Sequence, residues 1–357
     1  MASACSTRRC GSRARAPTPS AGDASTSWRP ACPRRRSTHS TQALGDWPDA
    51  IRLAARDWGV PLPPLTSQTY CPPALRIARR LEIRHDRLTA ENLEALASCE
   101  HLSQLRALLL FDSGLDLAAI AALCRSPSLG ALRTLTIGGN YVDDDGAKLI
   151  AEARAFPALE QLALPSNRLT SAAMRWLTES QRLAGLSALA LPENEIGDDG
   201  LAVLGRSRLL GQLRSLDVTS NEVGPDGMIS LCSGGALHRL EVAFLALNRC
   251  GDDGVAALAS SAARLIEANL SENRITAAGV GSLIAGAAFA PISRLSLAYN
   301  QLGTEGAMTL GDDDVRQLLA ADQLARLDTL DLRWNPISEN VASARQRPRI
   351  LVADPEP

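Results

Sequence analysis

One spacing of apolar residues and asparagine returns along most of the chain. A clear copy has apolar residues at its first, fourth, sixth and eleventh positions and Asn140 at its ninth, running from Leu132 to Val142. Through the middle of the chain the copies follow one another every 27 residues. The ninth position holds Asn140, Asn167, Asn194, Asn221, Asn248, Asn273, Asn300 and Asn335, with Asp86 and Ser113 in two degenerate copies before them. Ten copies at a nearly fixed period predict a solenoid with one structural unit per copy.

Each copy is predicted to form a strand, a turn and a helix. Apolar residues alternate with other residues before the asparagine, which is the two-residue period of a strand. The sixteenth and nineteenth positions are apolar in nearly every copy, as in Met174 and Leu177, and this spacing places both on one helix face. Glycine at the fifteenth position would let the helix pack closely against the neighbouring turn, and it occurs at Gly146, Gly200, Gly227, Gly254, Gly279 and Gly306.

A helix between successive strands is the crossover that parallel strands require. We therefore expect one parallel sheet backed by a layer of helices. Strands stack about 4.8 Å apart, whereas packed helices lie about 8 to 10 Å apart, so the strand side must be the shorter, concave side. The asparagines are predicted to form a structural ladder, because an amide side chain both donates to and accepts from backbone groups that a turn leaves unpaired.

The L-x-x-L-x-L-x-x-N core with its 27-residue helical repeat resembles the ribonuclease-inhibitor-like class of leucine-rich repeats, over about residues 78–340. The resemblance implies an α/β leucine-rich-repeat solenoid, a horseshoe of about ten repeats with short parallel strands on the concave face and helices on the convex face. It also implies a protein-protein interaction module or scaffold that binds another protein on its concave face. The alternative is a regulator of a GTPase, similar to the activating proteins built on this repeat class, although no residue here matches a motif of such regulators.

The segments outside the repeats have different compositions. Residues 1–42 are rich in Ser, Ala, Arg, Pro and Thr, which predicts a disordered basic tail and also fits an organellar transit peptide. Residues 43–77 predict a helical N-terminal cap with Trp47 and Trp58 in its core, because an uncapped first repeat would expose its apolar side. Residues 341–357 are predicted to be a C-terminal tail.

Charge separates the tail from the body of the chain. The formal net charge is −2, and eight Arg with one acid give residues 1–40 a charge of +7, which leaves −9 for the remainder. An acidic body repels phosphate backbones, so we expect no nucleic-acid binding by the repeats, and only the tail could supply it. No run of about 18 apolar residues and no signal-peptide core occur, so we expect no membrane partner. The expected location is the cytoplasm, or an organelle if the tail is a transit peptide.

No motif predicts catalysis, a cofactor, a metal site or a small-molecule substrate. The four histidines are scattered, and the chain contains no H-E-x-x-H, G-x-S-x-G or phosphate-binding-loop motif. Acidic clusters such as Asp143–Asp145 lack the spacing of a calcium loop and are interpreted as helix caps. The eight cysteines form no C-x-x-C pair, which favours reduced thiols of an intracellular protein, with Cys124, Cys232 and Cys250 as small core residues.

The positions that should face the concave side change character along the array. These are the third, fifth, seventh and eighth, and through the middle copies they are small or uncharged, as in Thr134, Thr136 and Ala190. From the copy that contains Asn248 onward they become large or charged, Glu272 among them. Because such residues dominate interfaces, we predict that a partner binds at Phe244, Leu247, Glu267, Asn269, Arg294, Tyr299, Asp331, Arg333 and Trp334.

Two alternatives qualify this site. Tyr299 and Trp334 could instead cover the last copies, which lack a full C-terminal cap before Pro348. A second, smaller cluster at the other end of the array ranks below the first, and it consists of Arg80, Arg84, His85 and Phe111.

Overall fold

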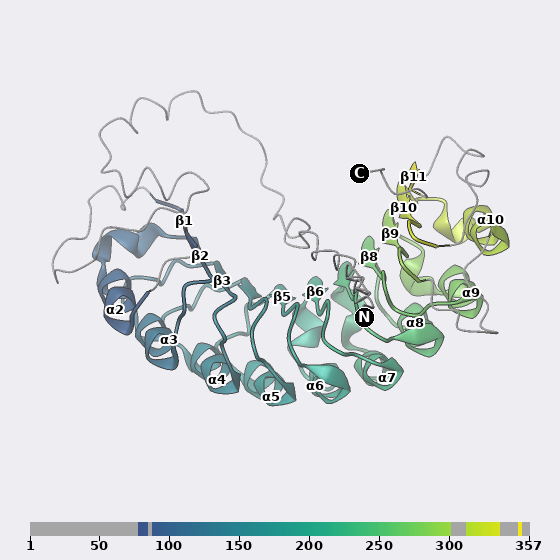
Figure 1. Ribbon diagram of the computed structural model, residues 1–357. Coiled ribbons are helices and arrows are strands. Elements are labelled where there is room, and N and C mark those ends of the chain that lie inside the picture. Colours follow the sequence, from purple (N-terminus) through teal and green to yellow (C-terminus); the bar gives the residue numbers. More distant parts are fainter. Residues whose placement is uncertain (1–77, 85–87, 301–311, 336–348, 352–357) are drawn as a thin grey trace, which may run out of the picture. The chain divides into compact units, whose positions relative to one another are not determined.

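The structure consists of one parallel β-sheet with a row of helices beside it (Figure 1). It is a computed structural model that describes residues 78–84, 88–300, 312–335 and 349–351. The expected basic tail at 1–42, the expected cap at 43–77 and His85 lie outside the described residues. The strands are β1 (Arg80–Arg84), β2 (Ala107–Phe111), β3 (Thr134–Gly138), β4 (Gln161–Ala163), β5 (Ala188–Ala190), β6 (Ser215–Asp217), β7 (Val242–Phe244), β8 (Glu267–Asn269), β9 (Arg294–Ser296), β10 (Thr329–Asp331) and β11 (Arg349–Leu351).

The crossovers between these strands carry the helices, as the repeat pattern predicted. They are α2 (Ala90–Ser98), α3 (Leu117–Cys124), α4 (Asp144–Glu152), α5 (Ser171–Glu179), α6 (Gly197–Gly205), α7 (Pro225–Ser233), α8 (Gly251–Ala259), α9 (Ala277–Ala285) and α10 (Asp312–Ala320). Short 3₁₀ turns follow several of them, at Glu100–Gln104, Leu210–Gln212, Ala236–Arg239, Ala287–Phe289 and Asp322–Leu324. Within this array the strands line the concave side and the helices the convex side, which confirms the expected α/β solenoid (Figure 1).

The core lies between the sheet and the helices and is built from the apolar positions of the repeat. Leu135 and Ile137 of β3 are fully buried, and Leu135 stands opposite Leu162 of β4. On the helix side, Met174 and Leu177 of α5 are fully buried too, as their spacing predicted. Each copy therefore buries its apolar side against the next, and stability is shared between neighbours.

The asparagines join consecutive copies through their side-chain amides. Oδ1 of Asn167 accepts hydrogen bonds from the backbone N–H groups of Asn140 (3.2 Å) and Val142 (3.0 Å) in the preceding copy. Nδ2 of Asn167 donates to the carbonyl oxygens of Ile137 (2.8 Å) and Pro165 (3.0 Å). The side chain is buried, so these bonds satisfy backbone groups that water does not reach. The same arrangement recurs at Asn140, Asn248 and Asn300.

The acidic clusters cap helices, and some of them cap the helix of the following copy. Asp143 caps its own helix, with Oδ1 accepting from the N–H of Gly146 (3.0 Å). Asp144 instead reaches the start of α5, where its carboxylate accepts from the N–H (2.8 Å) and the hydroxyl (2.7 Å) of Thr170. Such bonds satisfy helix N-terminal groups and fix the stacking of neighbouring helices. Two further aspartates make the same link to the next copy, Asp198 to Gly224 and Asp252 to Thr276.

Close packing at the fifteenth position is confirmed at Gly227. A Cβ on this residue would lie 2.8 Å from the Cα of Asp198 in the preceding copy. Because that atom belongs to the backbone, it has little freedom to move aside. Gly227 therefore allows α6 and α7 to approach closely enough for the aspartate to bond across copies.

Two expectations at the ends of the array need correction. Residues 341–357 were expected to be a tail, yet β11 pairs in parallel with β10, with Ile350 opposite Leu330. No repeat asparagine follows this strand in the sequence, so the pattern did not mark it, and it covers the main-chain edge of β10. The thiols were expected to be reduced, yet Cys99, which follows α2, is disulfide-bonded. Cysteine spacing does not determine pairing, so the sequence held no signal for this bond.

Candidate functional site

The predicted site residues fall into two groups in the structure. Phe244, Glu267, Asn269, Arg294 and Asp331 lie on strands β7 to β10, in adjacent register. Leu247, Tyr299, Arg333 and Trp334 lie beyond the strand ends, because the strands from β4 to β10 span only the third to fifth positions. The sequence argument applied the two-residue period of a strand to the seventh and eighth positions. In these copies the strand ends before it reaches them.

The polar residues of the first group bond to one another or to their own turns. Arg294 pairs with Glu267 of the neighbouring strand, and this hydrogen bond raises the pKa of the Arg294 guanidinium. Oδ1 of Asn269 accepts from the N–H (3.1 Å) and the hydroxyl (2.7 Å) of Ser271. The carboxylate of Asp331 holds Arg333, with its Oδ2 2.7 Å from Nη2. These side chains thus form hydrogen bonds and ion pairs within the array that do not depend on a partner.

The eighth residue of each copy has a left-handed backbone conformation, with φ between 49° and 63° wherever it is described. Glycine or a small polar residue adopts this conformation at the lowest cost, and a bulky side chain is unusual there. Nevertheless Leu247, Tyr299 and Trp334 occupy it, and their exposed fractions are 44%, 44% and 41%. The rings of Tyr299 and Trp334 stack with their centroids 5.0 Å apart. We call these three residues the exposed cluster; the turn itself does not require their size.

A hollow of about 500 Å³ adjoins the exposed cluster. Part of its wall comes from eighth-position residues, including Leu247, Glu272 and Tyr299, and the rest comes from Asn248 and from residues that directly follow ladder asparagines. Burial raises the pKa of the Glu272 carboxyl. We call this feature the edge hollow, and its lining is Ser220, Glu222, Leu247, Asn248, Arg249, Glu272, Arg274 and Tyr299.

Three residues of the edge hollow were missed by the sequence argument. Glu222, Arg249 and Arg274 occupy the tenth position, directly after the ladder asparagine, whereas the prediction considered only positions before it. A signal was present, because the tenth position is charged in five consecutive copies. Those residues are Arg168, Glu195, Glu222, Arg249 and Arg274.

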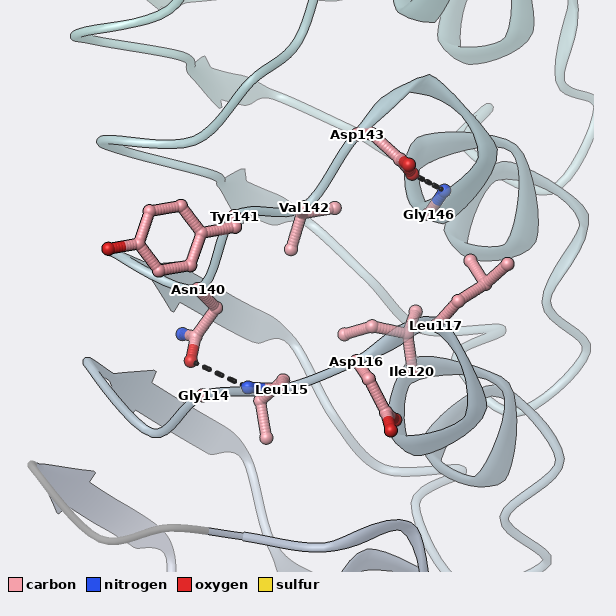
Figure 2. Close-up of a pocket in the computed structure, with 10 residues that line it drawn as sticks. All are labelled: Gly114, Leu115, Asp116, Leu117, Ile120, Asn140, Tyr141, Val142, Asp143 and Gly146. Atoms are coloured by element: carbon pink, nitrogen blue, oxygen red, sulfur yellow. Dashed lines mark hydrogen bonds between the residues drawn. The ribbon is translucent and has the colours of Figure 1, made fainter.

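A smaller hollow of about 270 Å³ lies near the other end of the array, between the turns that precede α3 and α4 (Figure 2). Its polar side chains belong to the repeat framework. Asn140 accepts from the N–H of Leu115 (3.3 Å), and Asp143 caps α4 (Figure 2). Tyr141 is the one aromatic residue of its lining, and the guanidinium of Arg168 lies 4.6 Å from the ring centroid. This hollow therefore has fewer uncommitted polar groups than the edge hollow.

The smaller predicted cluster is held together by its own contacts. Arg84 lies over the ring of Phe111, 4.1 Å from its centroid. Glu82 receives hydrogen bonds from Arg84 (2.6 Å) and Arg80 (2.9 Å). Burial alone would raise the pKa of Glu82, but these two arginines bring it below its ordinary value. Both arginines of this cluster are therefore engaged with the one carboxylate of β1.

Cysteine and metal chemistry add no further site in the part of the chain that the structure describes. Burial raises the pKa of Cys124, Cys232 and Cys250 to about 12 in each case. A thiol with so high a pKa is a poor nucleophile at neutral pH. Among the described residues, no group of three or more His, Cys, Asp or Glu is placed to hold a metal ion, and no helix is long and apolar enough to cross a membrane.

Comparisons with known proteins bear on the type of repeat. The family model described as "Leucine Rich repeat" matches residues 213–232 and 291–311. No curated protein matches the chain. Similar solved structures are the Rad7 and Elc1 complex of yeast (17% identity, 76% of this chain and 80% of that chain, TM-score 0.39), an internalin, inlF, of Listeria monocytogenes (17%, 79% and 88%, 0.45) and InlP of Listeria monocytogenes (15%, 85% and 67%, 0.38). Similarity of this degree assigns neither a partner nor an activity to the chain.

Proposed function

We propose that this chain, a leucine-rich-repeat protein, binds another protein on the strand side of its array, at the copies that contain Asn248 to Asn335. A stacked array of this kind presents an extended concave surface, which supports protein interaction in general. We place the repeats in the ribonuclease-inhibitor-like class, on the grounds of the 27-residue period and the nine-residue helices from α4 to α10.

The exposed cluster is the observation that carries this proposal. Leu247, Tyr299 and Trp334 hold large apolar side chains in water and in a backbone conformation that disfavours them. Aromatic residues supply much of the energy at protein interfaces, and the stacked rings of Tyr299 and Trp334 are of this kind. The alternative, that Tyr299 and Trp334 only cover the end of the array, is less well supported, because β11 already covers the edge of β10.

The proposal is tested by capture of partners on the intact chain and on single variants, followed by quantitative mass spectrometry. Tyr299→Ala and Trp334→Ala should weaken the binding of a captured partner by about 1 kcal/mol or more at one of the two positions. Melting temperature should change little. The matched control is Tyr141→Ala, because Tyr141 is also an exposed tyrosine with a left-handed backbone but lies six copies before Tyr299.

Two results would contradict the proposal. One is a partner retained equally by all three variants. The other is a lowered melting temperature with unchanged affinity, which would make Tyr299 and Trp334 a cap. The GTPase-regulator alternative makes a distinct prediction, since a regulator accelerates GTP hydrolysis by its partner at substoichiometric amounts, whereas a scaffold does not.

A further inference from the structure

Two arginines of the edge hollow have no counter-charge within the described part of the chain. Arg249 and Arg274 directly follow Asn248 and Asn273, so they occupy equivalent positions in consecutive copies. Both are exposed, and their guanidinium groups form no hydrogen bond or ion pair with described residues. Several exposed arginines of the strands do pair with a carboxylate of a neighbouring copy: Arg133 with Glu160, Arg214 with Glu241 and Arg294 with Glu267.

The position of these two arginines favours an anion between them. Consecutive copies are about 4.8 Å apart along the sheet, so the two cations are held in neighbouring turns by the array. A guanidinium binds a carboxylate through two parallel hydrogen bonds, which is stronger and more specific than a contact between point charges. The pair therefore suits a carboxylate supplied from outside the chain.

Among the described residues, neither glutamate of the hollow forms an ion pair with Arg249 or Arg274. The pKa of Glu272 is raised, with burial as its cause, whereas a nearby cation would lower it. The same glutamates limit the kind of anion that fits. Glu222 and Glu272 line the hollow, and Glu193 and Glu195 lie in the copy before it. A polyanion such as a nucleic acid would meet all four carboxylates along its length, whereas a single carboxylate at the two arginines would avoid Glu193 and Glu195.

The wall next to the arginines is apolar in part, with Glu272 in the copy between those of Leu247 and Tyr299. Leu247 and Tyr299 both line the hollow and are exposed. From the copy of Ser220 to the copy of Tyr299 there are three steps, which is about 14 Å, or the length of about four residues of extended chain. The hollow thus offers a partly apolar wall and a cationic pair within the reach of a short peptide segment.

We propose that the edge hollow binds an extended segment of the protein partner, in which an aspartate or glutamate pairs with Arg249 and Arg274 and a neighbouring apolar side chain packs against Leu247 and Tyr299. This inference rests on the proposed function and names the partner's chemistry. It requires no change in the fold, because all four residues already stand at the surface.

The test uses a displayed library of random peptides, selected against the full-length chain. Enriched peptides should share an acidic residue beside an aromatic or aliphatic one. The affinity of a selected peptide, measured by fluorescence anisotropy, should fall about tenfold or more in the double variant Arg249→Gln/Arg274→Gln. Amidation of the peptide's acidic side chain should cause a similar loss, and the two losses should not add, because they remove the same interaction. Affinity should also fall as salt concentration rises.

The matched control is Arg168→Gln, which occupies the same tenth position but lies over Tyr141. It should leave the affinity unchanged, and circular dichroism should give equal melting temperatures for all variants. Peptides that depend on Tyr299 but not on the two arginines would overturn the carboxylate inference and leave the proposed function intact. An absence of enriched peptides would overturn it as well. So would binding of single-stranded DNA to the parent chain that disappears in the double variant. The proposed function fails separately, if a captured protein partner is retained equally by the parent chain, Tyr299→Ala and Trp334→Ala.

Discussion

The strand side of β3 to β6 and that of β7 to β10 differ, although both share one framework. In the first stretch the side chains at the fifth position are small and shielded from solvent: Thr136, Ala163 and Ala190 are all buried. Gly138 shows how tight this surface is, because a Cβ there would lie 2.8 Å from the Phe111 ring and 2.9 Å from Pro165. In the second stretch Arg294, Tyr299 and Trp334 are exposed.

The difference shows which positions the fold controls. Leucine and asparagine positions are buried in both stretches and make the same contacts, since the strands remain in register from β3 to β10. The strand-side positions are left to vary, so large exposed residues there call for an explanation outside the fold. Three predictions test this division between a common framework and a variable surface, and they are ordered by the size of the expected effect.

The largest effect should come from the ladder, and it should be equal in the two stretches. Asn167→Ala and Asn248→Ala remove four and five hydrogen bonds and leave buried backbone groups unpaired. We expect each to lower the free energy of unfolding by about 3 kcal/mol, measured by urea denaturation. The control is Asn269→Ala, whose bonds lie within its own turn and whose loss should be about 1 kcal/mol. A much smaller loss for Asn248→Ala than for Asn167→Ala would mean that the two stretches do not share one framework.

A smaller effect should distinguish the packed surface of the first stretch. Thr136 is buried. In the part of the chain that the structure describes, its Oγ1 is the only buried side-chain nitrogen or oxygen atom without a hydrogen-bond partner. Thr136→Val keeps the shape of the side chain and removes the unsatisfied hydroxyl. We therefore expect the free energy of unfolding, measured by urea or thermal denaturation, to rise by about 1 kcal/mol. The control is Thr134→Val, because the hydroxyl of Thr134 donates to Gln161 (3.0 Å). If both variants lose stability equally, this surface is hydrated rather than closed.

Most of the framework could be predicted from the sequence, because it depends on local spacing. The apolar positions, the ladder and the helix faces all repeat, so each copy supports the interpretation of the others. The exceptions do not repeat. β11 is three residues long and carries no pattern, and the disulfide of Cys99 depends on three-dimensional proximity. The links from Asp144 to Thr170 were also invisible, because they join two copies whose relative position only the fold defines.

The candidate site was predicted less completely, for a physical reason. A strand period assigns faces to alternate residues, but the residues that line the edge hollow lie in a turn, where a left-handed backbone conformation sets the direction of the side chain. Arg249 and Arg274 were therefore not considered. Conversely, Asn269 and Asp331 were included for their polarity, and the structure places both in bonds within their own turns. Sequence alone does not separate a polar residue that is engaged from one that is free.

The smallest effect should come from Asp217, the last residue of β6, at the boundary between the two stretches. Asp217 is buried, and burial raises the pKa of its carboxyl, more than the hydrogen bonds from Thr219 lower it. The folded state therefore resists ionisation of this carboxyl, so stability is lost as pH rises from the unfolded-state value near 3.8 through the raised folded-state value. Asp217→Asn keeps an oxygen that can accept from the N–H of Thr219, as Asn269 already does toward Ser271, and it removes the buried charge. We expect the variant to melt at a slightly higher temperature at pH 7, with the difference shrinking as pH falls toward 4. Asp331→Asn is the control, because it weakens the pair with Arg333 and should give no such gain. A variant that melts lower than the parent at pH 7 would show that the Asp217 charge is stabilised by its surroundings, contrary to this account.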